Sequence, residues 1–135
     1  MTRLWYLTSY DTVLPDFLDW VKKDPKLEQD THACLHALRE QGNLLSLPMS
    51  RSLGKGIFEL RPHANQVEAR LLYYFGATEK GEPKAVFTNT FIKKTRATPR
   101  EEINLAKSRR KELEDQEKAN RKRSRGNDHG HRTYH

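Results

Sequence analysis

The sequence predicts an α+β fold in which two N-terminal helices, forming a helical hairpin, pack on a twisted, mainly antiparallel sheet of about four strands, and a C-terminal helix follows. Three runs rich in aromatic and β-branched residues, at 54–61, 69–75 and 91–95, have the composition of strands. Turn-forming segments at 62–66 and 78–83 separate them, which favours an antiparallel meander.

Length, charge and cysteine content limit the class of protein. The 135 residues suit one domain with a core plus a short extension. The net charge of +7 and the pI of about 9.6 favour a polyanionic partner, either nucleic acid or an acidic protein. Cys34 is the only cysteine, which excludes an internal disulfide and a multi-cysteine zinc site. Without a leader-like start or a run of about 20 apolar residues, we expect a soluble cytoplasmic protein with no membrane partner.

The N-terminal part is expected to hold one strand and two helices. Residues 4–8 form a short aromatic run, which we assign to an edge strand of the later sheet. Thr12 is a cap-type residue ahead of apolar residues at helical spacing, which predicts the first helix. Asp24 and Pro25 repeat this start, and Gly42 stands where the second helix ends.

The segment 44–56 is interpreted as a loop that crosses from the helices to the sheet, because proline, glycine and serine interrupt it. Arg51 and Lys55 lie on this segment, and a loop can present such charges to a ligand. For Arg51 an ordinary solvated side chain is the favoured interpretation.

The period of two in a strand predicts which side chains share a face of the sheet. One face is apolar and suits the two helices; its side chains are Phe58, Leu60, Leu71, Tyr73 and Phe75. The other face carries Glu59, Arg61, Arg70, Leu72 and Tyr74 if the register allows it. We expect this second face to be either half solvated or a binding surface.

The motif Thr98-Pro99-Arg100-Glu101 has the form of a capping box and predicts the start of the C-terminal helix. Ile103, Ala106 and Leu113 form only a narrow apolar stripe, so this helix is expected at the edge of the protein. From residue 118 onward six basic residues and one acidic residue follow with no apolar stripe. We therefore divide the chain into a domain at 1–117 and a basic, disordered tail at 118–135 that binds anions.

Three segments together carry a family resemblance: GIFELR at 56–61, ARLLYYF at 69–75 and FIKKT at 91–95, followed by Thr98-Pro99 and EINLAKSRR at 102–110. In this order and spacing they resemble the phage-derived, HigB-like branch of the RelE/ParE toxins, the toxin halves of type II toxin-antitoxin pairs. The resemblance implies a RelE-like fold and a metal-independent endoribonuclease that cleaves mRNA on the ribosome. It also implies two partners, a helix-turn-helix antitoxin and ribosome-bound mRNA, and no small-molecule cofactor.

The resemblance also suggests site residues. Arg70 matches the arginine at the start of the family's central strand and is the first candidate for a phosphate clamp, because a guanidinium can bond two phosphate oxygens. Arg61 is the second candidate. Lys93 and Lys94 match the family's basic pair and are candidates for proton transfer, with His63 as the alternative. Further candidates for RNA contact, apart from His63, are Lys55 and Tyr74.

Simpler interpretations remain open for several of these residues. Arg70 could form a cross-strand pair with Glu59 without any catalytic role. Lys93 and Lys94 could protect a strand edge from aggregation. We expect no metal site, since the histidines near the C-terminus lack a scaffold; these are His129, His131 and His135.

Two other functions remain open besides the mRNA interferase. ParE relatives share the fold and inhibit DNA gyrase without cleaving RNA, and fold alone does not separate the two activities. The second is a basic nucleic-acid-binding accessory protein of a phage or mobile element, in which the tail does the binding.

Overall fold

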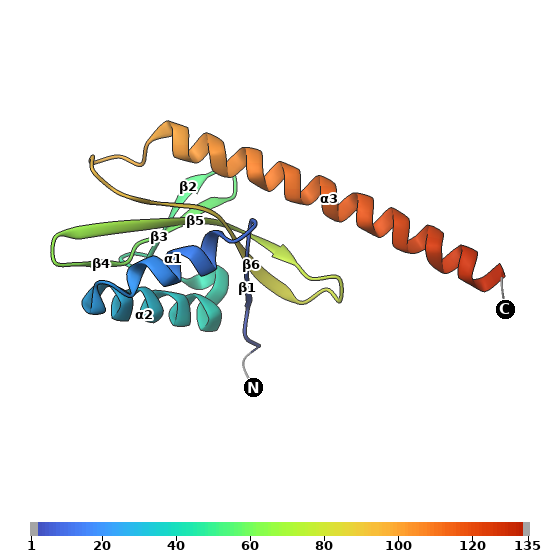
Figure 1. The fold of residues 1–135 in the computed structure, drawn as a ribbon, viewed down its shortest axis with the longest axis horizontal. Coiled ribbons are helices and arrows are strands. Elements are labelled where there is room, and N and C mark those ends of the chain that lie inside the picture. The colour runs from blue at the N-terminus through green and yellow to red at the C-terminus, as the bar shows by residue number, and fades with distance from the viewer. Residues whose placement is uncertain (1–2, 134–135) are drawn as a thin grey trace.

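A computed structural model describes residues 3–133 of the chain, with side chains through residue 124. It has three layers (Figure 1): two helices, α1 (Val13–Val21) and α2 (Pro25–Gln41), a central sheet, and a long helix, α3 (Arg100–Thr133), on the opposite face. The strands are β1 (Tyr6–Ser9), β2 (Ser50–Gly54), β3 (Ile57–Leu60), β4 (His63–Ala64), β5 (Val67–Ala77) and β6 (Pro83–Ile92). A single 3-10 turn, Gly42–Leu44, follows α2. The predicted α+β class is confirmed.

The sheet has six strands where about four were predicted. Their order is β1-β6-β5-β3-β2, and the short β4 pairs with β5 beside this path. Pairing is antiparallel except between β1 and β6, which run parallel, so the sheet is mixed. The N-terminal strand lies at an edge, as predicted, and adds to β6.

The second helix begins and ends where the sequence predicts. Asp24 caps it by accepting a hydrogen bond from the Leu27 backbone N–H at 3.2 Å, and Pro25 takes the first helical position. Gly42 closes it with φ of 54°, a conformation that suits glycine. The first helix has nine residues and the second seventeen, so the predicted hairpin is an unequal pair.

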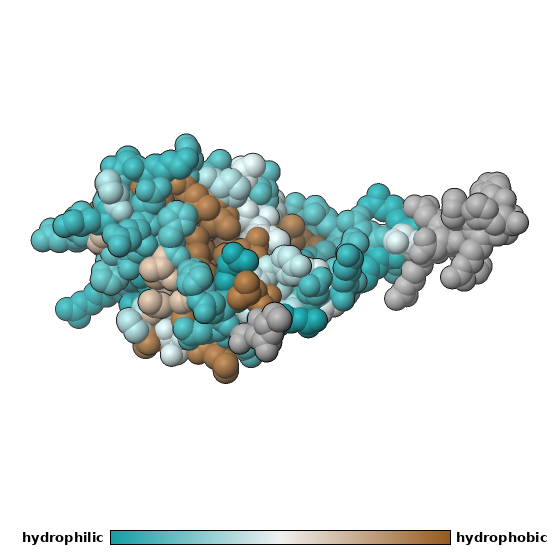
Figure 2. Space-filling model, turned by 90° about the horizontal axis from the view of Figure 1, so that it is seen from below, coloured by the Kyte–Doolittle hydropathy of each residue, from teal (hydrophilic) through white to brown (hydrophobic). Residues whose placement is uncertain are grey.

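The face of the sheet toward α1 and α2 is the apolar one, as predicted. Leu60, Leu71 and Tyr73 are buried there, and Phe58 and Phe75 pack against the same cluster. The helices contribute their inward stripes, namely Leu14, Phe17, Val21, Leu27, Leu35 and Leu38. Figure 2 looks onto the outer side of α1 and α2, where some hydrophobic residues are visible among hydrophilic ones; the core itself lies beneath this surface.

The second face of the sheet is also covered, which corrects the expectation of a half-solvated or binding surface. Leu72 and Tyr74 form a smaller core with Ile57, Val86 and the completely buried Ala106 of α3. The narrow stripe of α3 is sufficient because it meets an apolar strip of sheet. The helix therefore packs on the sheet rather than lying at the edge of the protein.

Two strand predictions were wrong in position. The last long strand occupies Pro83–Ile92, so the predicted strand at 91–95 is mostly loop, and Lys93 and Lys94 lie just beyond the strand end. The predicted loop at 44–56 contains β2, which pairs with β3. This pairing gives Arg51 a fixed place opposite Glu59.

The C-terminal helix differs from its prediction at both ends. Thr98 donates its hydroxyl hydrogen to the carboxylate of Glu59, a partner outside the helix, and α3 begins at Arg100. Where the sequence predicts a disordered tail from residue 118, the structure has α3 continuing to Thr133, and lysine, arginine and alanine in this stretch are strong helix formers. The division of the chain at 117/118 into a domain and a tail stays a prediction. Within residues 3–133, no helix is apolar and long enough to cross a membrane.

Candidate functional site

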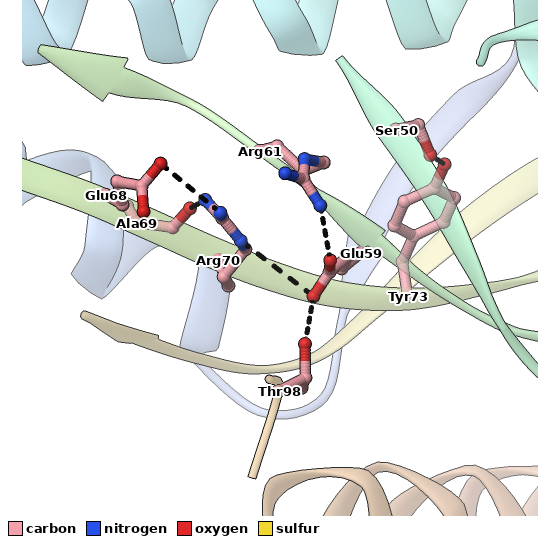
Figure 3. Close-up of polar contacts among 8 residues, drawn as sticks. All are labelled: Ser50, Glu59, Arg61, Glu68, Ala69, Arg70, Tyr73 and Thr98. Carbon is pink, nitrogen blue, oxygen red and sulfur yellow. Dashed lines mark hydrogen bonds and ion pairs between the residues drawn. The ribbon is translucent and has the colours of Figure 1, made fainter. Parts of the chain in front are cut away.

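A buried cluster of charged side chains lies on the α3 face of the sheet (Figure 3). Glu59 comes from β3 and Arg70 from β5, while Arg61 follows β3 and Thr98 precedes α3. Glu59 lies opposite Leu72, so Arg70, two residues before Leu72, lies diagonally across from it on the same face. The alternation of side chains along the strands predicted one shared face, and the structure confirms that placement for Glu59 and Arg70.

The carboxylate of Glu59 is the centre of the cluster. Its side chain is completely buried. Arg61 Nη1 donates to Glu59 Oε1 at 2.8 Å, and Thr98 Oγ1 donates to Glu59 Oε2 at 2.5 Å. Both carboxylate oxygens are therefore bonded, which is what allows an ionised group to be buried.

Arg70, the first candidate for a phosphate clamp, is buried and already engaged. Its side chain is 1% exposed, with Nε 3.9 Å from Glu59 Oε2 and Nη2 3.6 Å from Glu68 Oε1. Nη1 donates to the carbonyl of Ala69 at 2.8 Å, while Nε has no hydrogen-bond partner among the described side chains. Burial lowers the pKa of Arg70, and the nearby Arg61 lowers it further. The cross-strand pair with Glu59 is thus present, and Arg70 does not reach the surface in this arrangement.

Arg61 is the member of the cluster that reaches solvent, with 22% of its side chain exposed. Near it, an open groove of about 330 Å³ is lined by Arg51, Leu53, Arg96, Ala97, Thr98 and Ile103. Arg51 and Arg96 are exposed. Thr98 belongs both to the groove and to the buried cluster, so it joins the two. We name the groove and Arg61 together the basic groove.

Arg51 and Arg96 are site residues that the sequence did not indicate: Arg51 was expected to be an ordinary solvated side chain, and Arg96 was not a candidate. Arg51 was missed because Ser50–Gly54 was interpreted as a loop. As strand β2 it pairs with β3, which places Arg51 directly opposite Glu59. The sequence of this strand, Ser-Arg-Ser-Leu-Gly, gave no clear indication, because small and turn-forming residues interrupt it. Arg96 lies in the loop before α3, and only the fold brings it to β2.

Lys93 and Lys94 lie at the end of the sheet that carries Arg61 and Arg70. The backbone N–H of Lys93 donates to the carbonyl of Glu68 at 2.7 Å, which fixes Lys93 beside the residue that pairs with Arg70. Lys93 is partly buried and Lys94 is exposed. In the part of the chain with described side chains, neither lysine forms an ion pair or side-chain hydrogen bond.

The structure does not bring the three predicted RNA-contacting residues to the cluster. Lys55 is exposed in the β2–β3 turn, where its carbonyl accepts a bond from Arg110 at 3.4 Å. His63 donates its backbone N–H to Asp30 of α2 at 2.7 Å and lines a hollow beside that helix. This position separates it from the α3 face.

Tyr74 is 1% exposed and lies beneath Arg110, whose guanidinium carbon is 4.9 Å from the ring centre. Burial raises the pKa of Tyr74 to about 12. Because α3 covers the ring, Tyr74 presents almost no surface in this arrangement, and its contact with RNA stays a prediction. The alternation of side chains along the strand correctly placed Tyr74 on the same face as Arg70. It could not predict that α3 covers this face.

Among the described residues, no group of three or more histidine, cysteine, aspartate or glutamate side chains lies close enough to hold a metal ion. What the site offers chemically is a set of fixed positive charges around one buried carboxylate. Such a set can bind the oxygens of a phosphate group.

The fold and site define a small α+β protein with a basic groove beside a buried, arginine-bound carboxylate. A comparison with protein-family models matches residues 19–111 to the family described as Phage derived protein Gp49-like (DUF891). The chain belongs to this family. The match runs from within α1 through the rest of the sheet and into α3, leaving out β1 and the last part of α3. A search of curated protein sequences finds no match.

Proposed function

We propose that this protein is the toxin of a type II toxin-antitoxin pair and cleaves mRNA on the ribosome. Membership of a phage-derived family agrees with the resemblance to HigB-like toxins. The observation that carries the proposal is the basic groove on a protein of net charge +7: Arg51 and Arg96 line it, and Arg61 is linked to it because Glu59 bonds both Arg61 and the groove residue Thr98. A guanidinium group is well suited to an RNA phosphate because it stays charged and donates two parallel hydrogen bonds.

The proposed reaction uses the 2′-hydroxyl of the RNA as nucleophile. The 2′-oxygen bonds to the adjacent phosphorus and the bond to the 5′-oxygen breaks, leaving a 2′,3′-cyclic phosphate and a 5′-hydroxyl. One proton leaves the 2′-hydroxyl and another is delivered to the departing 5′-oxygen. The protein must also stabilise the negative charge that grows on the phosphoryl oxygens.

Arg61 is the proposed phosphate-binding residue, because it combines partial exposure with a position fixed by Glu59. Arg51 and Arg96, which line the groove together with Thr98, are proposed to hold the RNA backbone. Arg70 becomes a positioning residue: it lies behind Glu59 and supports the carboxylate that orients Arg61. Lys93 or Lys94 is the proposed proton carrier, since both follow β6 at this end of the sheet.

The proposed partners follow from the same surface. Ribosome-bound mRNA would occupy the basic groove. A helix-turn-helix antitoxin with acidic or apolar side chains would neutralise the toxin by covering that groove.

The test is induction of the gene followed by growth measurement and mapping of mRNA ends by primer extension. Wild type is expected to arrest growth and produce new mRNA ends. Arg61→Ala should lower cleavage on the order of 100-fold, as expected for loss of a group that contacts developing charge. Arg51→Ala and Arg96→Ala remove exposed side chains, so reduced cleavage in these variants cannot be attributed to loss of the core.

Lys22→Ala is the matched control, because Lys22 is an exposed cation on the opposite, helical side of the sheet. It should retain full activity. Growth arrest without new mRNA ends would overturn the nuclease proposal and favour a gyrase inhibitor of the ParE type.

A further inference from the structure

The last part of α3 extends beyond the body of the protein. Glu117 of α3 forms an ion pair with Lys84 of β6 at 2.7 Å, and one turn further Asn120 and Arg121 still line a hollow with Ala77, Thr78 and Glu79. Every residue at 118–124 is exposed. Figure 1 shows the helix continuing well past the β5–β6 hairpin. At about 1.5 Å per residue, residues 118–133 reach about 24 Å beyond that ion pair; we name them the basic arm.

Charge is distributed unequally along α3. Within residues 112–117, just before the arm, each acidic residue has a partner: Glu112 with Tyr10, Glu114 with Arg110, Asp115 with Lys111 and Glu117 with Lys84. Residues 118–124 contain four basic residues and no acidic residue. The positive charge of this stretch is therefore not neutralised by its own residues.

The basic residues also share a face. Lys118, Arg121 and Lys122 are spaced i, i+3 and i+4, and the backbone position of Arg125 adds i+7. Residues at this spacing are neighbours on a helix surface. A helix already holds these cations in a row, so less conformational entropy is lost on binding a row of phosphates than from an irregular segment.

The composition of residues 118–124 favours nucleic acid over other partners. Residues 118–124 offer no apolar side chain larger than Ala119, and Figure 2 shows this segment as hydrophilic. A protein interface needs an apolar centre depleted in lysine, and a membrane-surface helix needs an apolar face. Contacts to nucleic-acid phosphates need neither, because they are polar and carried by lysine and arginine.

We infer that the basic arm is a second RNA-binding element, which contacts the phosphate backbone of double-helical RNA at a distance from the basic groove. The contact is independent of base sequence. It lies outside the part of the chain that matches the family model, which ends at residue 111. The groove would thus hold the strand to be cut while the arm holds structured RNA nearby, so this division of roles rests on the proposed function.

The test measures binding of the full-length protein to a short RNA duplex of arbitrary sequence by fluorescence anisotropy, as salt is raised from about 50 to about 200 mM. The arm variant carries Lys118→Gln, Arg121→Gln and Lys122→Gln. The control carries Lys22→Gln, Lys23→Gln and Lys26→Gln, three exposed lysines that remove the same charge from the helical side. Circular dichroism of each variant reports whether the helices are retained.

The slope of log affinity against log salt should be shallower by about 2 to 3 in the arm variant, because three cations are removed and each phosphate that is no longer neutralised reduces the slope by roughly 0.7 to 0.9. The control should keep the wild-type slope. Equal slopes in the two triple variants would overturn the inference.

A charge-preserving variant, Lys118→Arg with Lys122→Arg, should bind like wild type, and weakened binding there would also overturn it. The measurement needs no cleavage, so an inactive nuclease would refute the proposed function without affecting this result.

Discussion

Glu59 is completely buried and is paired with two arginines, so its removal should lower the free energy of unfolding. Glu59→Ala leaves the buried Arg70 and the partly buried Arg61 as like charges without their shared carboxylate. Breaking a buried pair in this way typically destabilises a protein by about 3 to 5 kcal/mol. We therefore expect a clear fall in the urea midpoint of unfolding with an unchanged dependence on urea.

Glu68→Ala is the matched control for this prediction. Glu68 also approaches Arg70, at 3.6 Å, but half of its side chain is exposed. Its loss should change the free energy of unfolding by no more than about 1 kcal/mol. Similar losses in the two variants would show that Glu59 is not the centre of the cluster.

The composition of the site was only partly predictable at the level of single residues. Alternation placed Glu59 and Arg70 on one face, because a strand's period of two does not depend on what covers it. The burial of Arg70 was not predictable, since it depends on the packing of α3 and the loop through Thr98. For the same reason Tyr74 was predicted as a surface residue and is a core residue.

At the scale of elements, the end of α2 requires glycine at position 42 for two reasons, its backbone conformation and its close contact with Trp5. Its φ is 54°, and a Cβ at this position would overlap the indole ring of Trp5, which packs on Phe75. Gly42→Ala should therefore lower stability by about 1 kcal/mol for the backbone conformation and by a further 1 to 3 kcal/mol, roughly, for overpacking.

Gly54 provides the comparison for Gly42. It also has a positive φ, of 88°, but a Cβ there would meet nothing within 4 Å. Gly54→Ala should show the backbone cost alone. Thermal unfolding of both variants measures the difference, and equal melting temperatures would mean that the contact with Trp5 does not matter.

Elements whose ends are marked by capping or turn-forming residues were predictable from the sequence, and elements without such residues were not. Asp24, Pro25 and Gly42 mark α2 because capping chemistry acts over a few residues. The last long strand was misplaced because its pattern is interrupted: Tyr73 pairs with Phe87 but Leu72 pairs with Asn89, so Thr88 is an extra residue. Such a bulge shifts the alternation of inward and outward side chains and hides the strand.

At the scale of the whole molecule, α3 has two parts: the part before residue 118 covers the sheet, and residues 118–124 of the arm do not contribute to the core. Removing residues 118–135 should change the free energy of unfolding by less than about 0.5 kcal/mol, since residues 118–124 are exposed. Removing residues 106–135 takes away Ala106 and Leu113 and uncovers Leu72 and Tyr74, so cooperative unfolding should be lost. Thermal melts of the two truncated chains give the comparison. A shorter truncation that also unfolds the protein would show that the arm belongs to the core.

The α+β class and the first core were predictable for this molecule because both follow from residue periodicity. The three-layer arrangement was not, because the stripe of α3 is too narrow to indicate what it covers. The groove was not predictable either, because Arg51 and Arg96 are far apart in the sequence. They come together only because the loop before α3 returns to β2.

The parallel pairing of β1 with β6 bears on the order in which the chain can assemble. Tyr6 lies opposite Lys84, more than half of the chain's length away, so β1 has no strand partner until β6, the last of the described strands, has been synthesised. Contacts between such distant segments form slowly because a large loop must close first. During synthesis β1 therefore stays unpaired for a long time. Its pairing with β6 is expected to be one of the last steps of folding.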